Sequence, residues 1–226
     1  MGTEAGTLSL EAAVTGYFRA PDPARLVECF GAAPVTDNWR AQTVLTLPVF
    51  LALMIDNAPT AAALLVDAVR GGDAVKIEVV AQALNYSHHP DRRKLMERLV
   101  GEAAAGSMDP AGADFKTFTP THPVHVDMLW AAFFATGEPV YVARIAGLLD
   151  GWMPESQLQP LLAVAARDED SARRAMAGVL ADAAQWSLAA NARDLIEVRT
   201  ALAAHAARRD GLGAALAAKI LAGLGN

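Results

Sequence analysis

The apolar positions of this chain recur with the period of an α-helix, and no segment shows the alternation that is typical of a β-strand. Leu8 to Ala20 is predicted to form a first helix, with Ser9 as a candidate N-cap. Asp22 and Pro23 begin a second helix that runs through Phe30, because Asp accepts bonds from free N–H groups and Pro has none to leave unpaired. The pattern therefore predicts an all-α fold.

The same pattern continues through the rest of the chain. Asp73 is a further candidate N-cap, and Val44 to Ile55 is an apolar stretch, interrupted by Pro48, that predicts a buried helix. Longer helices are predicted toward the C-terminus: Glu169 to Ala190 with Met176, Val179, Leu180 and Ala183 on one stripe, Arg193 to Arg208, and Ala214 to Leu224.

Four prolines divide much of the chain into similar pieces. Pro23, Pro59, Pro90 and Pro139 each follow a helix with a large apolar residue six positions earlier, and each is followed by a second helix. The first two spacings, 36 and 31 residues, lie in the range of helix–turn–helix repeat units, whereas the third is 49 residues. This arrangement predicts stacked antiparallel helical hairpins, similar to an α–α superhelix, with a C-terminal helical bundle.

The long third spacing has a cause in the composition. Residues 101–123 contain three glycines and three prolines without a sustained apolar period, which predicts a loop or insertion. We expect N-terminal hairpins over 1–100, this loop, and C-terminal hairpins with capping helices over 124–226, all in one continuous domain.

Paired helices at this spacing resemble those of tetratricopeptide-like and related α-helical repeat proteins. The clearest unit runs from Trp130 through Gly137 and Pro139 to Gly151. The strings from Phe133 to Gly137 and from Trp186 to Asn191 are also similar to those of short bacterial helical proteins of unassigned function. The full consensus of the tetratricopeptide family is met in no unit, so the resemblance implies paired helices and carries no binding residue over.

Charge and cysteine content narrow the functional classes. A net charge of −6 and a pI near 5.3 argue against a nucleic-acid partner. Cys29, the single cysteine, excludes an internal disulfide and is predicted to be buried filler. No signal peptide or spanning apolar segment is visible, which favours a cytoplasmic location without stable membrane insertion; export with a removed signal peptide stays open.

One cluster could carry metal chemistry. His122, His125 and Asp127 lie within six positions, and imidazole and carboxylate groups are common ligands of zinc. A metal-dependent hydrolase at this site, with help from His88 or His89 in the turn before Pro90, is the alternative function. In the competing interpretation, His122, His125 and Asp127 are ordinary polar residues in the first turn of a helix.

Other catalytic signatures are missing from the sequence. There is no Gly-x-Ser-x-Gly elbow and no phosphate-binding glycine loop followed by Lys, and His205 is alone on an alanine-rich stretch. We therefore expect no catalytic residue and no cofactor, and an enzyme is the less favoured class.

The four tryptophans remain as candidate partner contacts. Trp39 and Trp152 are placed near helix ends, where a partly exposed indole can anchor a partner, whereas Trp130 and Trp186 have the spacing of core residues. The leading hypothesis is a non-enzymatic helical-repeat scaffold that binds a protein or peptide.

Overall fold

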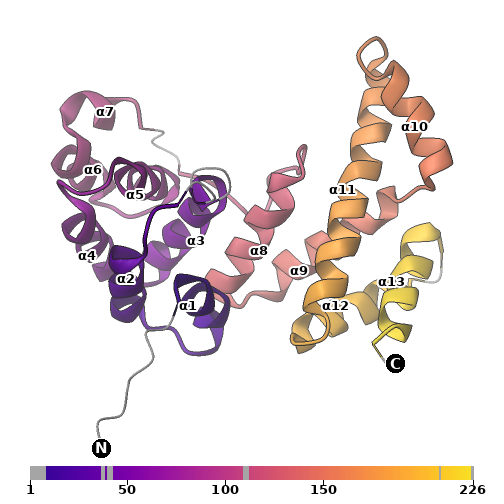
Figure 1. The fold of residues 1–226 in the computed structure, drawn as a ribbon, viewed down its shortest axis with the longest axis horizontal. Helices are drawn as coiled ribbons and strands as arrows, with labels where there is room; N and C mark the ends of the chain where they lie inside the picture. Colours follow the sequence, from indigo (N-terminus) through magenta and orange to yellow (C-terminus); the bar gives the residue numbers. More distant parts are fainter. Residues whose placement is uncertain (1–8, 37–38, 40–42, 109–111, 209, 225–226) are drawn as a thin grey trace, which may run out of the picture. The chain divides into compact units, whose positions relative to one another are not determined.

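The predicted all-α fold is confirmed by a computed structural model, which describes residues 9–36, 39, 43–108, 112–208 and 210–224 (Figure 1). These residues contain thirteen α-helices and two short 3-10 helices, and none of them lies in a strand. No helix among them combines the length and the apolar character that crossing a bilayer requires. The chain divides into two compact units, Met1–Phe115 with Ala131–Gly137, and Lys116–Trp130 with Glu138–Asn226.

The first unit holds the helices of the N-terminal half. They are α1 (Leu10–Gly16), η1 (Tyr17–Arg19), α2 (Pro23–Ala32), α3 (Val44–Asn57), α4 (Thr60–Val69), α5 (Ala74–Tyr86), α6 (Arg92–Val100) and α7 (Glu102–Gly106). Helix α8 (Val124–Thr136) passes from the second unit into the first after Trp130. Helix α3 is the centre of the first core: it packs against α5, and Phe50, Met54 and Ile55 are fully buried.

The second unit is built from the later helices. They are α9 (Pro139–Gly147), η3 (Leu148–Gly151), α10 (Glu155–Val164), α11 (Glu169–Asn191), α12 (Ile196–Ala206) and α13 (Leu212–Ala222). Helix α11, orange in Figure 1, packs against α10 and η3, and α12 packs against both α9 and α13. Leu149, Val198 and Leu202 are fully buried in this second core.

Helix starts follow the capping chemistry of the sequence. The Ser9 hydroxyl accepts a hydrogen bond from the N–H of Ala12 at 3.2 Å, and Asp22 accepts one from the N–H of Arg25 at 3.0 Å. Asp73 begins α5 in the same way, with the N–H of Val75 at 2.8 Å. The predicted first helix is shorter than expected, because the α-helix ends at Gly16 and the 3-10 helix η1 continues to Arg19.

The predicted loop at 101–123 is partly helical and is held at several points. It contains α7, and Phe115 packs edge-on against Tyr86 in the first unit with ring centroids 5.4 Å apart. In the second unit the Arg144 guanidinium donates to the carbonyl of Phe118 and lies 5.1 Å from the centroid of that ring. These aromatic and guanidinium contacts hold the segment against helices at two points. Its glycine and proline content alone does not predict such contacts.

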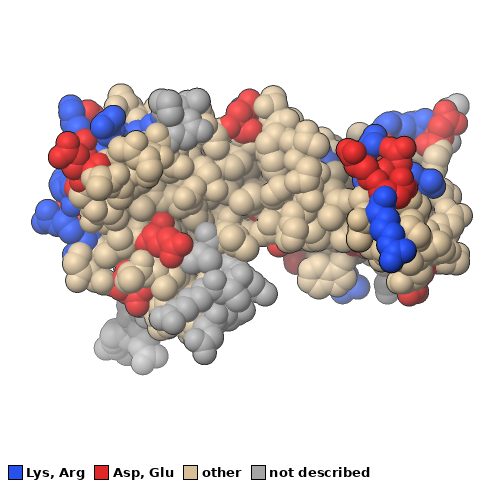
Figure 2. Space-filling view, turned by 90° about the horizontal axis from the view of Figure 1, so that it is seen from above, with Lys and Arg blue, Asp and Glu red and all other residues tan. Residues whose placement is uncertain are grey.

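Charged side chains of both signs are mixed on α6 and α4. Lys94 pairs with Asp91 at 2.9 Å, and Arg98 pairs with Asp67 of α4. Figure 2 shows Lys and Arg in blue next to Asp and Glu in red at one end of the molecule. Exposed pairs of this type add little to stability, so the two units depend mainly on their apolar cores.

Candidate functional site

The predicted metal ligands His122 and His125 bond to the backbone at the start of α8. The Nδ1 of His125 accepts from the N–H of Thr121 at 2.9 Å, and the Nδ1 of His122 accepts from the N–H of Val124 at 3.2 Å. Burial lowers the pKa of His125 below its ordinary value, and the neighbouring His122 lowers it further. His122 therefore satisfies one of the N–H groups that the first turn of α8 leaves free, and His125 accepts from an N–H that precedes the helix.

Asp127 does not join the two imidazoles in a metal-binding group. Within the described parts of the chain, no three His, Cys, Asp or Glu side chains are placed to hold one ion. Burial raises the pKa of Asp127, which disfavours the ionised form that a metal ligand needs. His88 lies in the first unit, where its Nδ1 is 3.0 Å from Asp56, and the Nδ1 of His89 accepts from the N–H of Asp91.

His205 has more contacts than its alanine-rich surroundings suggest. It is buried, and its Nε2 lies 3.1 Å from Asp150 of η3, at an angle too poor for a hydrogen bond. The guanidinium of Arg208 lies 3.0 Å from the other oxygen of Asp150 and 3.3 Å from the Nδ1 of His205. This cluster ties α12 to η3 and is a structural contact that the sequence analysis missed.

Trp39, one of the two predicted partner anchors, is half-buried against the first core. Its indole stacks on Phe30 with centroids 5.8 Å apart, and the ammonium of Lys76 lies 6.0 Å from it. The same ammonium donates to the carbonyl of Gly31 at 2.6 Å. Trp39 also lines a cavity of about 400 Å³ with residues of α1 and α3, so its indole packs on the core and faces a groove.

The other three tryptophans differ in exposure. Trp130 is buried as predicted, and Trp152, the second predicted anchor, is half-buried directly after η3. Trp186 was predicted to pack in the core, and this is wrong, because 76% of its surface is exposed. Its indole has no hydrogen-bond or ring partner among the described residues. An exposed Trp of this kind is typical of a binding surface.

Small residues explain why α11 turns Trp186 outward. The buried face of this helix contains Ala175, Gly178, Ala181, Ala184 and Ser187, together with Leu180 and Leu188. Such residues let neighbouring backbones approach closely; a Cβ on Gly151 of η3 would lie 2.7 Å from the carbonyl oxygen of Ala177. Since the core takes this small-residue face, the large side chain of Trp186 is left on the outer side, and Val179 is only half-buried.

A pocket of about 220 Å³ lies between α11 and α13, next to Trp186. The lining residues are Gln185, Ala189, Arg193, Leu216, Lys219, Ile220, Gly223 and Leu224. Trp186 precedes Ala189 by three positions, so their side chains leave the helix about 60° apart and Trp186 lies at the rim. We call this pocket together with Trp186 the α11–α13 groove.

Two cations flank the apolar floor of the α11–α13 groove. Arg193 follows the end of α11, and Lys219 lies in the last turn of α13; both are exposed, and neither side chain has an ion-pair partner in the described parts of the chain. One carboxylate lies near the other end: Asp182, one turn before Trp186, whose pKa is raised by burial and by Glu155. The groove thus has a cationic end and an apolar, weakly acidic end.

Comparison with known proteins adds no assignment to this geometry. The chain matches no protein-family model, no curated protein and no solved structure.

Proposed function

We propose that the protein is a non-enzymatic binding module that takes a segment of a partner protein into the α11–α13 groove. The observation that carries this proposal is the 76% exposure of Trp186, which directly follows the lining residue Gln185 along α11. Trp is the residue most enriched where single side chains dominate binding energy. The helical-repeat character expected from the sequence fits the same role, because packed helices present rigid surfaces.

Charge defines the chemistry of the partner segment. Arg193 and Lys219 favour carboxylates, and the apolar floor of Leu216 and Ile220 favours an aliphatic or aromatic side chain. The partner is therefore an acidic amphipathic segment with one apolar anchor. Asp182 repels carboxylates at the other end of the groove, which orients the acidic residues of the partner toward Arg193.

Two synthetic peptides test this proposal on the full chain. One is a 16-residue amphipathic peptide of Leu and Glu, and the other has Lys in place of every Glu; both carry a fluorescent label. Fluorescence anisotropy should show saturable binding of the acidic peptide, with an affinity that falls as salt rises. The basic peptide should bind much more weakly.

Variants locate the binding on the surface. Trp186→Ala should weaken binding of the acidic peptide by about 30-fold or more, the loss typical of a Trp that dominates binding energy. Lys219→Glu should also weaken binding of the acidic peptide, whereas Asp182→Asn should strengthen that binding. Arg174→Glu is the matched control, because Arg174 is exposed on α11 but does not line the pocket.

Two results would overturn the proposal. The first is equal affinity of the acidic and basic peptides, which would mean that the cations do not select the partner. The second is an unchanged affinity of the Trp186→Ala variant, provided that its circular dichroism spectrum matches that of the original chain.

A further inference from the structure

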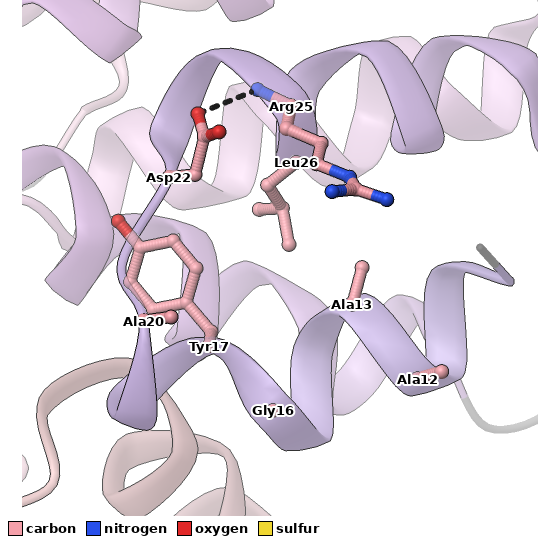
Figure 3. A pocket seen from close by; sticks show the side chains of 8 residues that line it. All are labelled: Ala12, Ala13, Gly16, Tyr17, Ala20, Asp22, Arg25 and Leu26. Carbon is pink, nitrogen blue, oxygen red and sulfur yellow. Dashed lines mark hydrogen bonds between the residues drawn. The ribbon is translucent and has the colours of Figure 1, made fainter. Parts of the chain in front are cut away.

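A second pocket lies in the first unit, between α1 and α2, and differs in chemistry from the α11–α13 groove. It has a volume of about 280 Å³ and is lined by Ala12, Ala13, Gly16, Tyr17, Ala20, Asp22, Arg25 and Leu26 (Figure 3). The hollow exists because α1 turns small residues toward it; a Cβ on Gly16 would meet no atom within 4 Å. Its floor is apolar and its upper edge is polar.

A carboxylate and a guanidinium of opposite charge line this pocket without pairing to each other. Asp22 accepts from the backbone N–H of Arg25 at 3.0 Å, but the side chains of the two residues form no ion pair. They lie three positions apart at the start of α2, on the same side of the helix. A ligand with a cation and an anion a few ångströms apart would pair with both groups.

The hydroxyl of Tyr17 supplies a third polar contact. Tyr17 is only 5% exposed, and its ring is fixed edge-on against Phe50 with centroids 5.3 Å apart. Figure 3 shows the hydroxyl on the same side of the pocket as Asp22, and it makes no hydrogen bond to a described residue. A hydroxyl without a hydrogen-bond partner in the wall of a pocket can donate to or accept from a ligand.

We propose that this pocket binds a free α-amino acid with an apolar side chain. The ammonium of the ligand lies between the Asp22 carboxylate and the Tyr17 hydroxyl, and its carboxylate accepts hydrogen bonds from the guanidinium of Arg25. The side chain of the ligand rests on Ala13 and Leu26. The proposal does not depend on the α11–α13 groove, which lies in the other unit.

Three small molecules test the proposal by NMR on the full chain. L-leucine carries both charges, 3-methylbutylamine lacks its carboxylate, and 4-methylpentanoate lacks its amine. Leucine should shift the amide signals of Ala13, Gly16 and Arg25 in a saturable way. Asp22 and Arg25 are exposed, so each analogue should bind more weakly by the few-fold that one exposed charge pair contributes.

Variants separate this site from unspecific binding. Asp22→Asn keeps the N-cap of α2 but removes its charge, and Arg25→Gln removes the guanidinium. Each variant should weaken leucine binding by the few-fold expected for an exposed charge pair. Gly16→Leu should abolish binding by filling the hollow. Glu28→Gln is the matched control, because Glu28 is exposed on α2 outside the pocket.

The proposal is overturned by any of three results. Leucine could fail to saturate any signal, 3-methylbutylamine could bind as tightly as leucine, or Asp22→Asn and Arg25→Gln could retain the original affinity. The second result would identify a simple cation site. Because Asp22→Asn keeps the cap, a loss of binding there cannot be attributed to an unfolded α2.

Discussion

The contact between α13 and η3 allows a sharp test of how the second unit is packed. Gly213, the second residue of α13, is buried against η3. A Cβ added there would lie 2.7 Å from the Oδ1 of Asp150, 2.8 Å from its backbone nitrogen and 2.8 Å from the carbonyl carbon of Leu149. Two of these atoms belong to the backbone, so Gly213→Ala can be accommodated only if α13 moves away from η3.

The expected cost follows from the packing. Overpacking of a well-filled core destabilises a protein by about 1–3 kcal/mol, and the better helix propensity of Ala returns at most about 1 kcal/mol. We expect a net loss of about 1–2 kcal/mol for Gly213→Ala, which for a chain of this length lowers Tm by about 2–8 °C. Gly147→Ala is the matched control, because a Cβ there meets nothing within 4 Å and the backbone is helical.

Urea unfolding followed by circular dichroism at 222 nm measures both variants. Gly147→Ala should be as stable as the original chain or more stable by up to about 1 kcal/mol, since Ala restricts the unfolded chain. A Gly213→Ala variant within about 0.5 kcal/mol of the original chain would refute the close approach of α13 to η3. If Gly147→Ala lowers the free energy of unfolding by a large amount, Cβ distances are not a valid way to rank the two glycines.

Three further predictions concern single side chains. Lys76→Met should destabilise the chain by about 1–3 kcal/mol in urea unfolding, because the carbonyl of Gly31 then loses its donor. His122→Gln should raise the pKa of His125 in an NMR titration, because His122 lowers that pKa in the folded chain. A lowered pKa means that protonation of His125 favours unfolding, so the free energy of unfolding should fall as the pH drops below about 6.5. Burial and Asp22 raise the pKa of Tyr17, so stability should fall as the pH rises above about 10, and Tyr17→Phe should make that fall shallower in alkaline urea titrations.

Local chemistry made the helices predictable. The N-caps at Asp22 and Asp73 depend on side chains within three residues, so the sequence contains all the information that they require. The same holds for the helix ends at Gly71 and Gly101, where φ is +75° and +91° and a side chain would be strained. Most of the apolar run predicted from Val44 to Ile55 is buried, because nearly all faces of the helix are apolar: Leu47, residues 49–52, Met54 and Ile55 are in the core, whereas Leu45 is 46% exposed.

The orientation of α11 was not predictable from the same rules. Periodicity weighs large apolar side chains, and it placed Leu180, which is buried, on the stripe of the core together with Met176, Val179 and Ala183. Met176, Val179 and Ala183 are only half-buried, whereas Ala175, Gly178 and Ala184 are buried. Small residues are selected where backbones approach closely, and that depends on which helix arrives from elsewhere in the chain. Tertiary packing therefore determines which face of α11 is buried.

The candidate sites depend on the same long-range packing. The α11–α13 groove joins residues more than 20 positions apart, so neither Arg193 nor Lys219 stood out in the sequence. The α1–α2 pocket was hidden for another reason: its walls are Ala and Gly, and its polar residues look like ordinary capping and turn residues. Only the arrangement of the two helices shows that Tyr17, Asp22 and Arg25 share one hollow.

The exposure of Trp186 can be measured without knowing any ligand, and the proposed function depends on it. Trp186 is 76% exposed, Trp130 is 6% exposed, and Trp39 and Trp152 are half-buried. Iodide quenches indoles that it can reach, so the original chain should show a readily quenched fraction of fluorescence that Trp186→Phe removes. Trp130→Phe should leave that fraction in place. If Trp186→Phe leaves iodide quenching unchanged, the indole is covered, and the groove cannot offer it to a partner.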